Sequence, residues 1–136
     1  KINKDVKRRE KFRPFAPSII DKFAKKWIKL DNHGDIYETH RWMIQAALAK
    51  KIMIKNAPSV VHYDESVRPQ IVSKIDNPLY YNLLNKFYEY SKIPLLLNTS
   101  FNVRGEPIIC NPYEALRCFF SHGLDVLVLG KFVLKK

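Results

Sequence analysis

Apolar residues recur along this chain in two spacings, one typical of helices and the other typical of buried strands. Over 21–30 and 77–92 they return every three or four residues, which predicts two helices that each bury one face. Short continuous apolar runs at 15–20, 95–97 and 125–129 predict buried strands. Because strands alternate with helices, the pattern predicts an α/β (α+β) fold, a mixed sheet with helices packed against it.

Two predicted helices begin with the same signal, an asparagine followed by a proline. Asn77 precedes Pro78 and Asn111 precedes Pro112, so each asparagine is the expected N-cap and each proline the first helical residue. We expect the second helix to end at Gly123. The predicted buried side chains are Leu79, Tyr80, Leu83, Leu84 and Phe87 in the first helix and Ala115, Leu116, Phe119 and Phe120 in the second.

The first half of the chain has a less regular pattern. Residues 42–47 fit either a strand or a helix, and we expect a strand followed by a lysine-rich connection. Further strands are expected at 59–63 and 68–75, paired as a hairpin across the polar turn between them. Pro17 limits the strand at 15–20 to a sheet edge or a strand start.

Composition narrows the class of protein. The chain has 136 residues, 46% of them hydrophobic, which suits one globular domain and excludes a disordered chain. No apolar run approaches the ~18 residues of a membrane-spanning helix and no signal peptide is present, so we expect a cytoplasmic protein. The first residue is Lys1 rather than methionine, which indicates a piece of a longer chain.

The cysteines and histidines indicate no metal centre. Cys110 and Cys118 are too few for a disulfide framework or a zinc site, and both lie among apolar neighbours, so we expect small core residues. His33 and His40 lie in or near a polar loop at 31–38 without further ligands at metal spacing. We expect solvated histidines there.

The formal net charge of +11 indicates an anionic partner: a phosphate, a nucleotide or a nucleic acid. Basic residues are dense over 1–13, and most of them are expected to be solvated. Arg13 differs because Phe12 and Phe15 flank it, so we expect the packing of these rings to hold its guanidinium in place as a ligand-binding group.

A polar cluster follows the apolar run at 95–97. It contains Asn98, Thr99, Ser100, Asn102, Arg104, Gly105 and Glu106. Polar residues at the end of a core strand are typical of ligand sites in open α/β sheets. A plain strand-to-turn transition favours the same residue types. The local pattern leaves both interpretations open.

Together, three separate pieces of the sequence predict one anion site. They are Lys7, Arg9 and Arg13 near the start, Arg68 after the turn, and Asn98, Ser100 and Asn102 at the strand end. Guanidinium groups grip phosphate oxygens in a fork, and lysine adds a compact charge. The sequence has no Walker-type glycine loop, so a triphosphate would depend on side chains.

Four segments carry motifs of a known family. They are Lys-Arg-Arg-Glu-Lys-Phe-Arg-Pro-Phe-Ala-Pro-Ser (7–18), Val-Arg-Pro-Gln-Ile-Val (67–72), Leu-Asn-Thr-Ser-Phe-Asn-Val-Arg-Gly-Glu-Pro-Ile (97–108) and Gly-Leu-Asp-Val-Leu-Val-Leu-Gly (123–130). They resemble the C-terminal domain of the NodU/CmcH-type O-carbamoyltransferases. The resemblance implies that 1–136 is this domain, with a YrdC-like fold built on a mixed twisted sheet.

The resemblance also implies a function. Such a domain takes carbamoyl phosphate and ATP, with Mg²⁺, and makes carbamoyl adenylate. A separate N-terminal Kae1-like domain with an iron site then passes the carbamoyl group to an alcohol that this domain does not choose. In the family, Lys7 and Arg9 match a Lys-x-Arg element, and Ser100 and Asn102 match a Ser-x-Asn element.

Site residues carry over by position. The catalytic ones would be Lys7, Arg13 and Arg68, and the substrate- and nucleotide-binding ones Lys7, Arg9, Arg13, Arg68, Asn98, Ser100, Asn102 and Arg104. Glu106 and Asp64 are weak candidates for Mg²⁺ binding, and no metal site is predicted in this domain. Where the family has Asp-Gly-Thr, this chain has Asp64-Glu65-Ser66. We expect Glu65 not to adopt glycine-type dihedral angles, so the turn and the direction of Arg68 should differ.

Two other hypotheses fit parts of the sequence. A basic YrdC-like module that binds RNA would account for the charge of +11 and the seven tyrosines. A purely structural domain would use its surface to dock onto the absent N-terminal domain.

Overall fold

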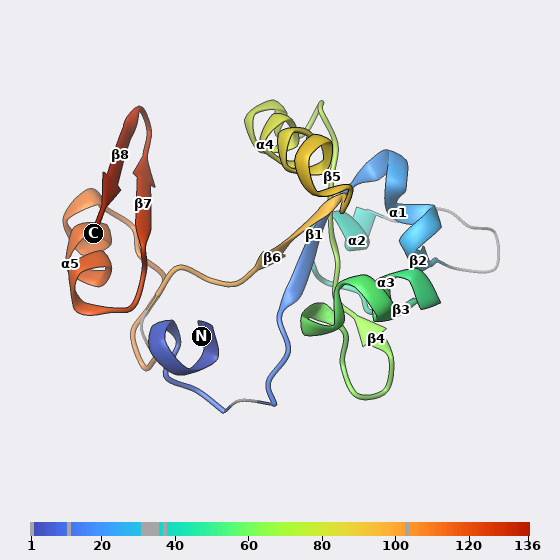
Figure 1. Cartoon of the computed structure of the whole chain (residues 1–136), viewed down its shortest axis with the longest axis horizontal. Helices are drawn as coiled ribbons and strands as arrows, with labels where there is room; N and C mark the ends of the chain where they lie inside the picture. Colours follow the sequence, from blue (N-terminus) through green and yellow to red (C-terminus); the bar gives the residue numbers. More distant parts are fainter. Residues whose placement is uncertain (1, 11, 31–35, 37, 103) are drawn as a thin grey trace. The chain divides into compact units, whose positions relative to one another are not determined.

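The computed structural model describes residues 2–10, 12–30, 36, 38–102 and 104–136. The chain forms two compact units, shown in Figure 1. Unit 1 comprises Lys1–Arg13 and Ser100–Lys136, and unit 2 comprises Pro14–Thr99. Helices alternate with short strands in mixed sheets, so the α/β prediction is confirmed.

Unit 2 contains two three-stranded sheets with helices between their strands. In chain order its elements are β1 (Ala16–Ile20), α1 (Asp21–Trp27), β2 (Ile28–Lys29), α2 (Glu38–Arg41), β3 (Ala47–Ala49), α3 (Lys51–Asn56), the 3₁₀ turn η2 (Pro58–Val60), β4 (Ser66–Val67), β5 (Gln70–Val72), α4 (Pro78–Ser91) and β6 (Leu95–Asn98). The strand orders are β5-β1-β6 and β2-β3-β4.

Strand β1 is the centre of its sheet. It pairs in parallel with β5 and antiparallel with β6, so of the two places predicted for Pro17, a sheet edge or a strand start, the edge does not apply. Pro17 is accommodated because the pairing with β5 begins only at Ser18, one residue later, and no bond of that ladder needs the missing N–H. The other half of the prediction is confirmed, since Pro17 is the second residue of the strand.

Side chains of β1 alternate between two hydrophobic clusters. Ile19 packs in the larger cluster together with Trp27 of α1 and Met53 of α3. Ile20 points to the other face and packs with Leu84 of α4. Both isoleucines are fully buried. The period-2 alternation of a strand therefore joins helices on both faces of this sheet.

Two predicted strands of this region, at 42–47 and 59–63, are wrong, and the strand at 68–75 contains β5 but has a different partner from the one predicted. Only Ala47 of the stretch predicted at 42–47 enters a strand, β3. Residues 42–46 lie outside any strand, and the side chains of Trp42 and Ile44 are not buried: the two residues are 55% and 70% exposed. The lysine-rich connection is helix α3. Residues 59–63 begin in the η2 turn, and β4 and β5 pair with β3 and β1 instead of forming the predicted hairpin.

Both asparagine-capped helices are confirmed. The Asn77 side chain accepts a hydrogen bond from the Tyr80 N–H (3.1 Å), and that of Asn111 accepts one from the Glu114 N–H (2.9 Å). The buried faces were only partly predicted: Leu84 and Phe119 are buried, whereas Leu79, Leu83 and Phe120 are exposed. In α4 the core contacts come from Tyr80, Tyr81, Leu84 and Tyr88, a stripe shifted by one residue.

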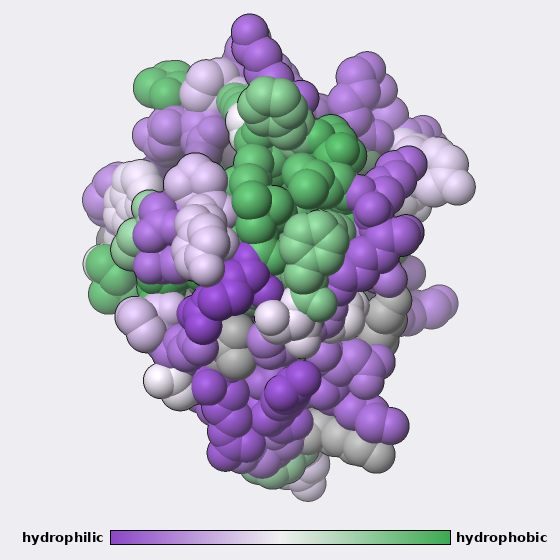
Figure 2. Space-filling view, turned by 90° about the vertical axis from the view of Figure 1, so that its left-hand side faces the viewer, coloured by the Kyte–Doolittle hydropathy of each residue, from purple (hydrophilic) through white to green (hydrophobic). Residues whose placement is uncertain are grey.

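Unit 1 contains the π-helix η1 (Ile2–Val6), α5 (Pro112–Ser121) and the hairpin of β7 (Val126–Leu129) and β8 (Phe132–Lys135). Its core consists of Ala115, Phe119 and Leu127. Val126 and Val128 are exposed, so the strand predicted at 125–129 is buried on one face only. Figure 2 views the side on which Figure 1 draws α5, β7 and β8, and it shows a continuous hydrophobic patch there.

The predictions for the cysteines and histidines are confirmed for some residues and wrong for others. Cys118 is buried as predicted, but Cys110 is exposed. His40 is buried, so its predicted solvation is wrong, and His33 lies outside the described residues. Among the described residues, no helix is both long and apolar enough to cross a membrane.

The turn before β4 keeps a glycine-type conformation without a glycine. Glu65 has φ of 62°, so the expected change of turn geometry is wrong. The Asp64 carboxylate accepts a hydrogen bond from the Ser66 N–H (3.0 Å). Hydrogen bonds from the Ser66 hydroxyl and then from the Ser66 N–H lower the pKa of Asp64. The Glu65 N–H donates to the His62 carbonyl (3.0 Å). These bonds hold Glu65 in a left-handed conformation that costs a non-glycine residue free energy.

Replacing Glu65 with glycine should therefore stabilise unit 2 by about 1 kcal/mol, because glycine adopts φ > 0 without a steric penalty. Both tryptophans, Trp27 and Trp42, belong to unit 2, so urea unfolding followed by tryptophan fluorescence reports on this unit. Glu65→Ala is the control, since alanine keeps the strain. Equal midpoints for the glycine and alanine variants would contradict the account.

Candidate functional site

The Lys7 side chain is buried in a cage of oxygen atoms within unit 1. Its Nζ donates to the carbonyl oxygens of Ser100 (2.9 Å) and Asn102 (3.1 Å). It also donates to Asn102 Oδ1 (2.6 Å) and Ser100 Oγ (3.2 Å). Only 6% of the residue is exposed. The four partners are uncharged, so the cage satisfies the ammonium as a donor without neutralising its charge.

Neighbouring cations increase this excess of positive charge. Burial is the main factor that lowers the pKa of Lys7, and Arg9 and Arg13 lower it further. Burial and the Arg13 charge also lower the pKa of Arg9. An anion placed beside these three groups would supply the missing countercharge, so the arrangement favours binding of a phosphate-like ligand.

Two residues of helix η1, Ile2 and Asn3, form hydrogen bonds with the basic residues Lys7, Arg9 and Arg13. The Lys7 N–H donates to the Ile2 carbonyl (2.8 Å). The Asn3 side chain accepts from Arg9 Nε (2.8 Å) and donates to the Arg13 carbonyl (2.8 Å). Asn3 therefore connects two of the predicted anion-binding arginines, and nothing in its sequence context predicted this role.

Gly123 fixes η1 against the turn that follows α5. Its N–H donates to the Asp5 carbonyl (3.2 Å), and a Cβ on Gly123 would lie 3.0 Å from Asp5 Cβ and 3.2 Å from Asp5 O. Helix α5 ends at Ser121 with His122 as its C-cap, so Gly123 is the first residue beyond the cap, the position predicted for the glycine that closes the helix. The glycine is needed here for close backbone approach.

The loop after β6 holds the oxygens of the cage in place. Ser100 Oγ donates to Asn102 Oδ1 (2.7 Å), and Asn102 Nδ2 donates to the Glu106 carbonyl (2.9 Å). Arg104 donates to the Arg8 carbonyl (3.1 Å), which ties the loop to the N-terminal segment. Gly105 has φ of 82°, so it supplies the turn expected of a glycine.

Both candidate magnesium ligands already interact with other residues. Glu106 forms an ion pair with Arg117 (2.7 Å), and Asp64 accepts the turn hydrogen bond from Ser66. Within the described residues, no group of three or more histidine, cysteine, aspartate or glutamate side chains is placed to hold a metal ion.

Unit 2 holds the other predicted site residues. Asn98 Nδ2 donates to Gln70 Oε1 (2.8 Å), and Ser18 Oγ donates to the same oxygen (2.6 Å). Asn98 Nδ2 also lies 3.5 Å from Met43 Sδ. Arg68 is exposed between β4 and β5. The structure thus brings Lys7 directly to the Ser-x-Asn oxygens, whereas the roles predicted for Arg13, Arg68 and Asn98 stay predictions.

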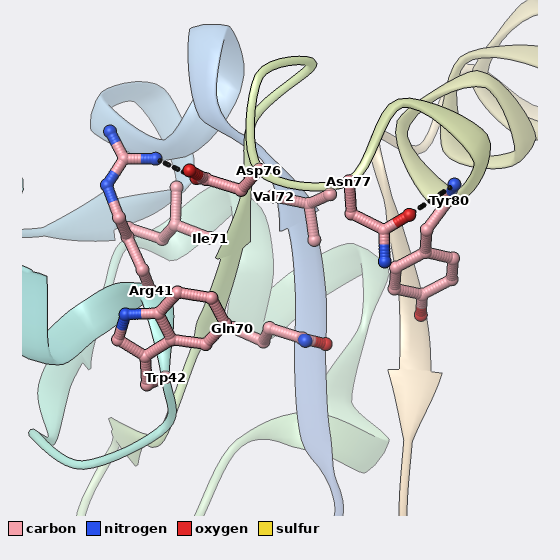
Figure 3. A pocket seen from close by; sticks show the side chains of 8 residues that line it. All are labelled: Arg41, Trp42, Gln70, Ile71, Val72, Asp76, Asn77 and Tyr80. Atoms are coloured by element: carbon pink, nitrogen blue, oxygen red, sulfur yellow. Dashed lines mark hydrogen bonds and ion pairs between the residues drawn. The ribbon is translucent and has the colours of Figure 1, made fainter.

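A pocket of about 70 Å³ lies in unit 2 beside β5 and the start of α4, as Figure 3 shows. It is lined by Arg41, Trp42, Gln70, Ile71, Val72, Asp76, Asn77 and Tyr80. Arg41 forms an ion pair with Asp76 (2.7 Å). The pocket was not predicted from the sequence, because residues 42–47 were expected to form a strand. The available signal was Gln70, a polar residue at the start of an apolar strand.

Comparison with known proteins shows which family the chain is similar to. The carbamoyltransferase C-terminus family matches residues 1–136. The chain is 40% identical to an uncharacterized protein of Synechocystis sp., over 99% of this chain and 24% of the relative. It is 35% identical to nodulation protein NolO of Bradyrhizobium diazoefficiens, over 100% of this chain and 24% of NolO.

A third relative has a named reaction. The chain is 27% identical to 3'-hydroxymethylcephem-O-carbamoyltransferase of Amycolatopsis lactamdurans, over 93% of this chain and 23% of that protein. The chain thus spans about a quarter of the length of these relatives. The match covers all four segments on which the resemblance was based, and the chain belongs to the carbamoyltransferase C-terminus family.

Proposed function

We propose that this domain forms carbamoyl adenylate from carbamoyl phosphate and ATP, as the first half of an O-carbamoyl transfer. The observation that carries the proposal is the buried Lys7 ammonium, held by uncharged oxygens and flanked by Arg9 and Arg13. Such a site stabilises anions, and both substrates are phosphate anions. Membership of the family and the named reaction of the Amycolatopsis relative support it.

The proposed chemistry needs no covalent enzyme intermediate. Water cleaves carbamoyl phosphate into carbamate and inorganic phosphate. A carbamate oxygen then attacks the α-phosphorus of ATP, the bond to the β-phosphate bridging oxygen breaks, and pyrophosphate leaves. Charge builds up on phosphate oxygens in this step. Lys7 and Arg9 would stabilise that charge from fixed positions, because the oxygen cage orients Lys7 and Asn3 orients Arg9, and Arg13 would add its charge nearby.

ATP would bring Mg²⁺ with it. Since Glu106 and Asp64 are already engaged, we assign no protein carboxylate to the ion, and Mg²⁺ commonly stays on substrate phosphates and water. The resemblance further assigns Arg68 and Asn98 to ligand contacts in unit 2. The alcohol acceptor and the iron-containing transfer site belong, in this proposal, to an N-terminal Kae1-like domain.

Lys7→Ala in the full-length protein should lower carbamoyl-phosphate-dependent exchange of pyrophosphate into ATP by about 30- to 150-fold. The loss corresponds to one charge-assisted contact worth about 2–3 kcal/mol. The matched control is Lys4→Ala, which removes an exposed lysine from helix η1, just before Lys7. An unchanged exchange rate in Lys7→Ala, or an equal loss in Lys4→Ala, would overturn the assignment of Lys7.

The pH dependence of the activity should reflect the loss of the Lys7 proton. Its lowered pKa means that the ammonium loses its proton at a lower pH than an ordinary lysine. Activity needs the charged form, so kcat/KM for carbamoyl phosphate should fall as pH rises through that lowered pKa. In Lys7→Arg the residual activity should lose this alkaline limb, because a guanidinium stays protonated. An identical limb in both proteins would assign it to another group.

A further inference from the structure

Glu10 is a carboxylate placed among the basic groups of the candidate anion site, within unit 1. Its Oε1 lies 3.5 Å from Nη2 of Arg104. Glu10 follows Lys7 by three residues in the sequence. Arg104 follows Asn102 by two, and the oxygens of Asn102 are part of the cage around Lys7. The Glu10–Arg104 ion pair therefore joins the two segments of unit 1 that form the cage.

The arginines of the anion site also act on this carboxylate. The Arg13 N–H donates to the Glu10 carbonyl (3.3 Å), which holds the two residues close together. The pKa of Glu10 is lowered, mainly by a hydrogen bond with its own backbone N–H. The charges of Arg104, Arg13 and Arg9 lower it further. Glu10 therefore already supplies part of the countercharge that a bound anion would bring to these arginines.

The contact between Glu10 and Arg104 is weak. Its distance of 3.5 Å is longer than the roughly 2.7–2.9 Å of a charge-assisted hydrogen bond. The side chains of Arg104 and Glu10 are 64% and 42% exposed, so water screens their attraction. By contrast, Glu106 and Arg117 of the same unit form an ion pair of 2.7 Å. The Glu10 pair can therefore open at a small cost in free energy.

The loop that carries Arg104 does not depend on this ion pair for its position. Nη1 of Arg104 donates to the Arg8 carbonyl (3.1 Å), on the same N-terminal segment as Glu10. The Lys7 ammonium adds four hydrogen bonds to Ser100 and Asn102 of the loop. When the Glu10 carboxylate is removed, these bonds still hold the two segments together, and only its charge is lost.

We propose that the Glu10 carboxylate is an intramolecular competitor for Arg104, which a phosphate ligand displaces when it binds. Nη1 of Arg104 stays on the Arg8 carbonyl, and Nη2 exchanges the carboxylate for a phosphate oxygen. The released carboxylate turns to solvent, because it and the ligand repel each other as like charges. The contact thus lowers the affinity of the free protein for anions. The inference rests on the proposed function for the assignment of an anion to this site.

Inorganic phosphate tests the competitor without turnover, in isothermal titration calorimetry of the full-length protein. Glu10→Gln should tighten phosphate binding by about 2- to 10-fold. The amide keeps the size of the side chain, but it neither forms an ion pair with Arg104 nor repels the ligand. A merely structural ion pair predicts the opposite sign, because its loss would loosen the site and weaken phosphate binding.

Asp5→Asn is the control for net charge. Asp5 is an exposed carboxylate of η1, and its replacement changes the charge of the same N-terminal segment by the same amount. A general effect of charge on phosphate binding would therefore appear in both variants, whereas competition for Arg104 predicts a gain in Glu10→Gln alone.

A double-mutant cycle tests whether the competition involves Arg104. Arg104→Gln removes the group for which Glu10 and the phosphate compete. Adding Glu10→Gln to this variant should therefore change phosphate affinity much less than Glu10→Gln changes it in the wild type. Equal effects in the two backgrounds would assign the influence of Glu10 to other groups and contradict the proposal.

An unchanged or weaker phosphate affinity in Glu10→Gln, or an equal gain in Asp5→Asn, would overturn the inference. So would an absence of phosphate binding in both the wild type and Glu10→Gln. The proposed function is tested separately by pyrophosphate exchange. Exchange in the wild type without a gain in Glu10→Gln refutes the competitor alone, whereas the gain without any exchange refutes the proposed chemistry alone.

Discussion

The candidate site depends on one uncompensated charge. Lys7 gives up most of its hydration and receives hydrogen bonds to uncharged oxygens in return. Burial of a charge is costly unless hydrogen bonds and a counterion replace the water. The cage provides the hydrogen bonds, and Arg9 and Arg13 add to the positive charge. The same four bonds join the N-terminal segment of unit 1 to the loop after residue 99, so the organisation of this unit and the anion binding that we propose for it have a common origin.

Local signals predicted the elements that are set by local chemistry. The asparagine and proline pairs at 77–78 and 111–112 gave two helix starts correctly, because the capping bond is made within one turn. The strand at 16–20 followed from its apolar run. What failed was pairing. Residues 59–63 and 68–75 look like a hairpin, but β5 finds its partner more than 50 residues earlier, and only the tertiary structure decides between such alternatives.

Some residues of the candidate site could also be predicted from local motifs, and others could not. Lys7, Ser100 and Asn102 were found from their motifs, and they are in contact. The role of Asn3 and the close approach of Gly123 to Asp5 were not predicted, because both depend on contacts with residues far along the chain or in another motif. Glu65 shows the limit of residue type as a guide: hydrogen bonds around the turn hold it at φ of 62°, a conformation that favours glycine. Trp42 was placed in a core strand because hydrophobicity alone does not distinguish a buried ring from one held at a pocket.

The most direct test of the account is the titration of Lys7 itself. In full-length protein with ¹³C-labelled lysine, assigned by comparison with Lys7→Arg, NMR follows the Lys7 side chain with pH. The account predicts a pKa below that of the other lysines, and a rise of this pKa when carbamoyl phosphate is added, because the bound anion supplies the missing countercharge. An ordinary pKa that carbamoyl phosphate does not change would contradict it.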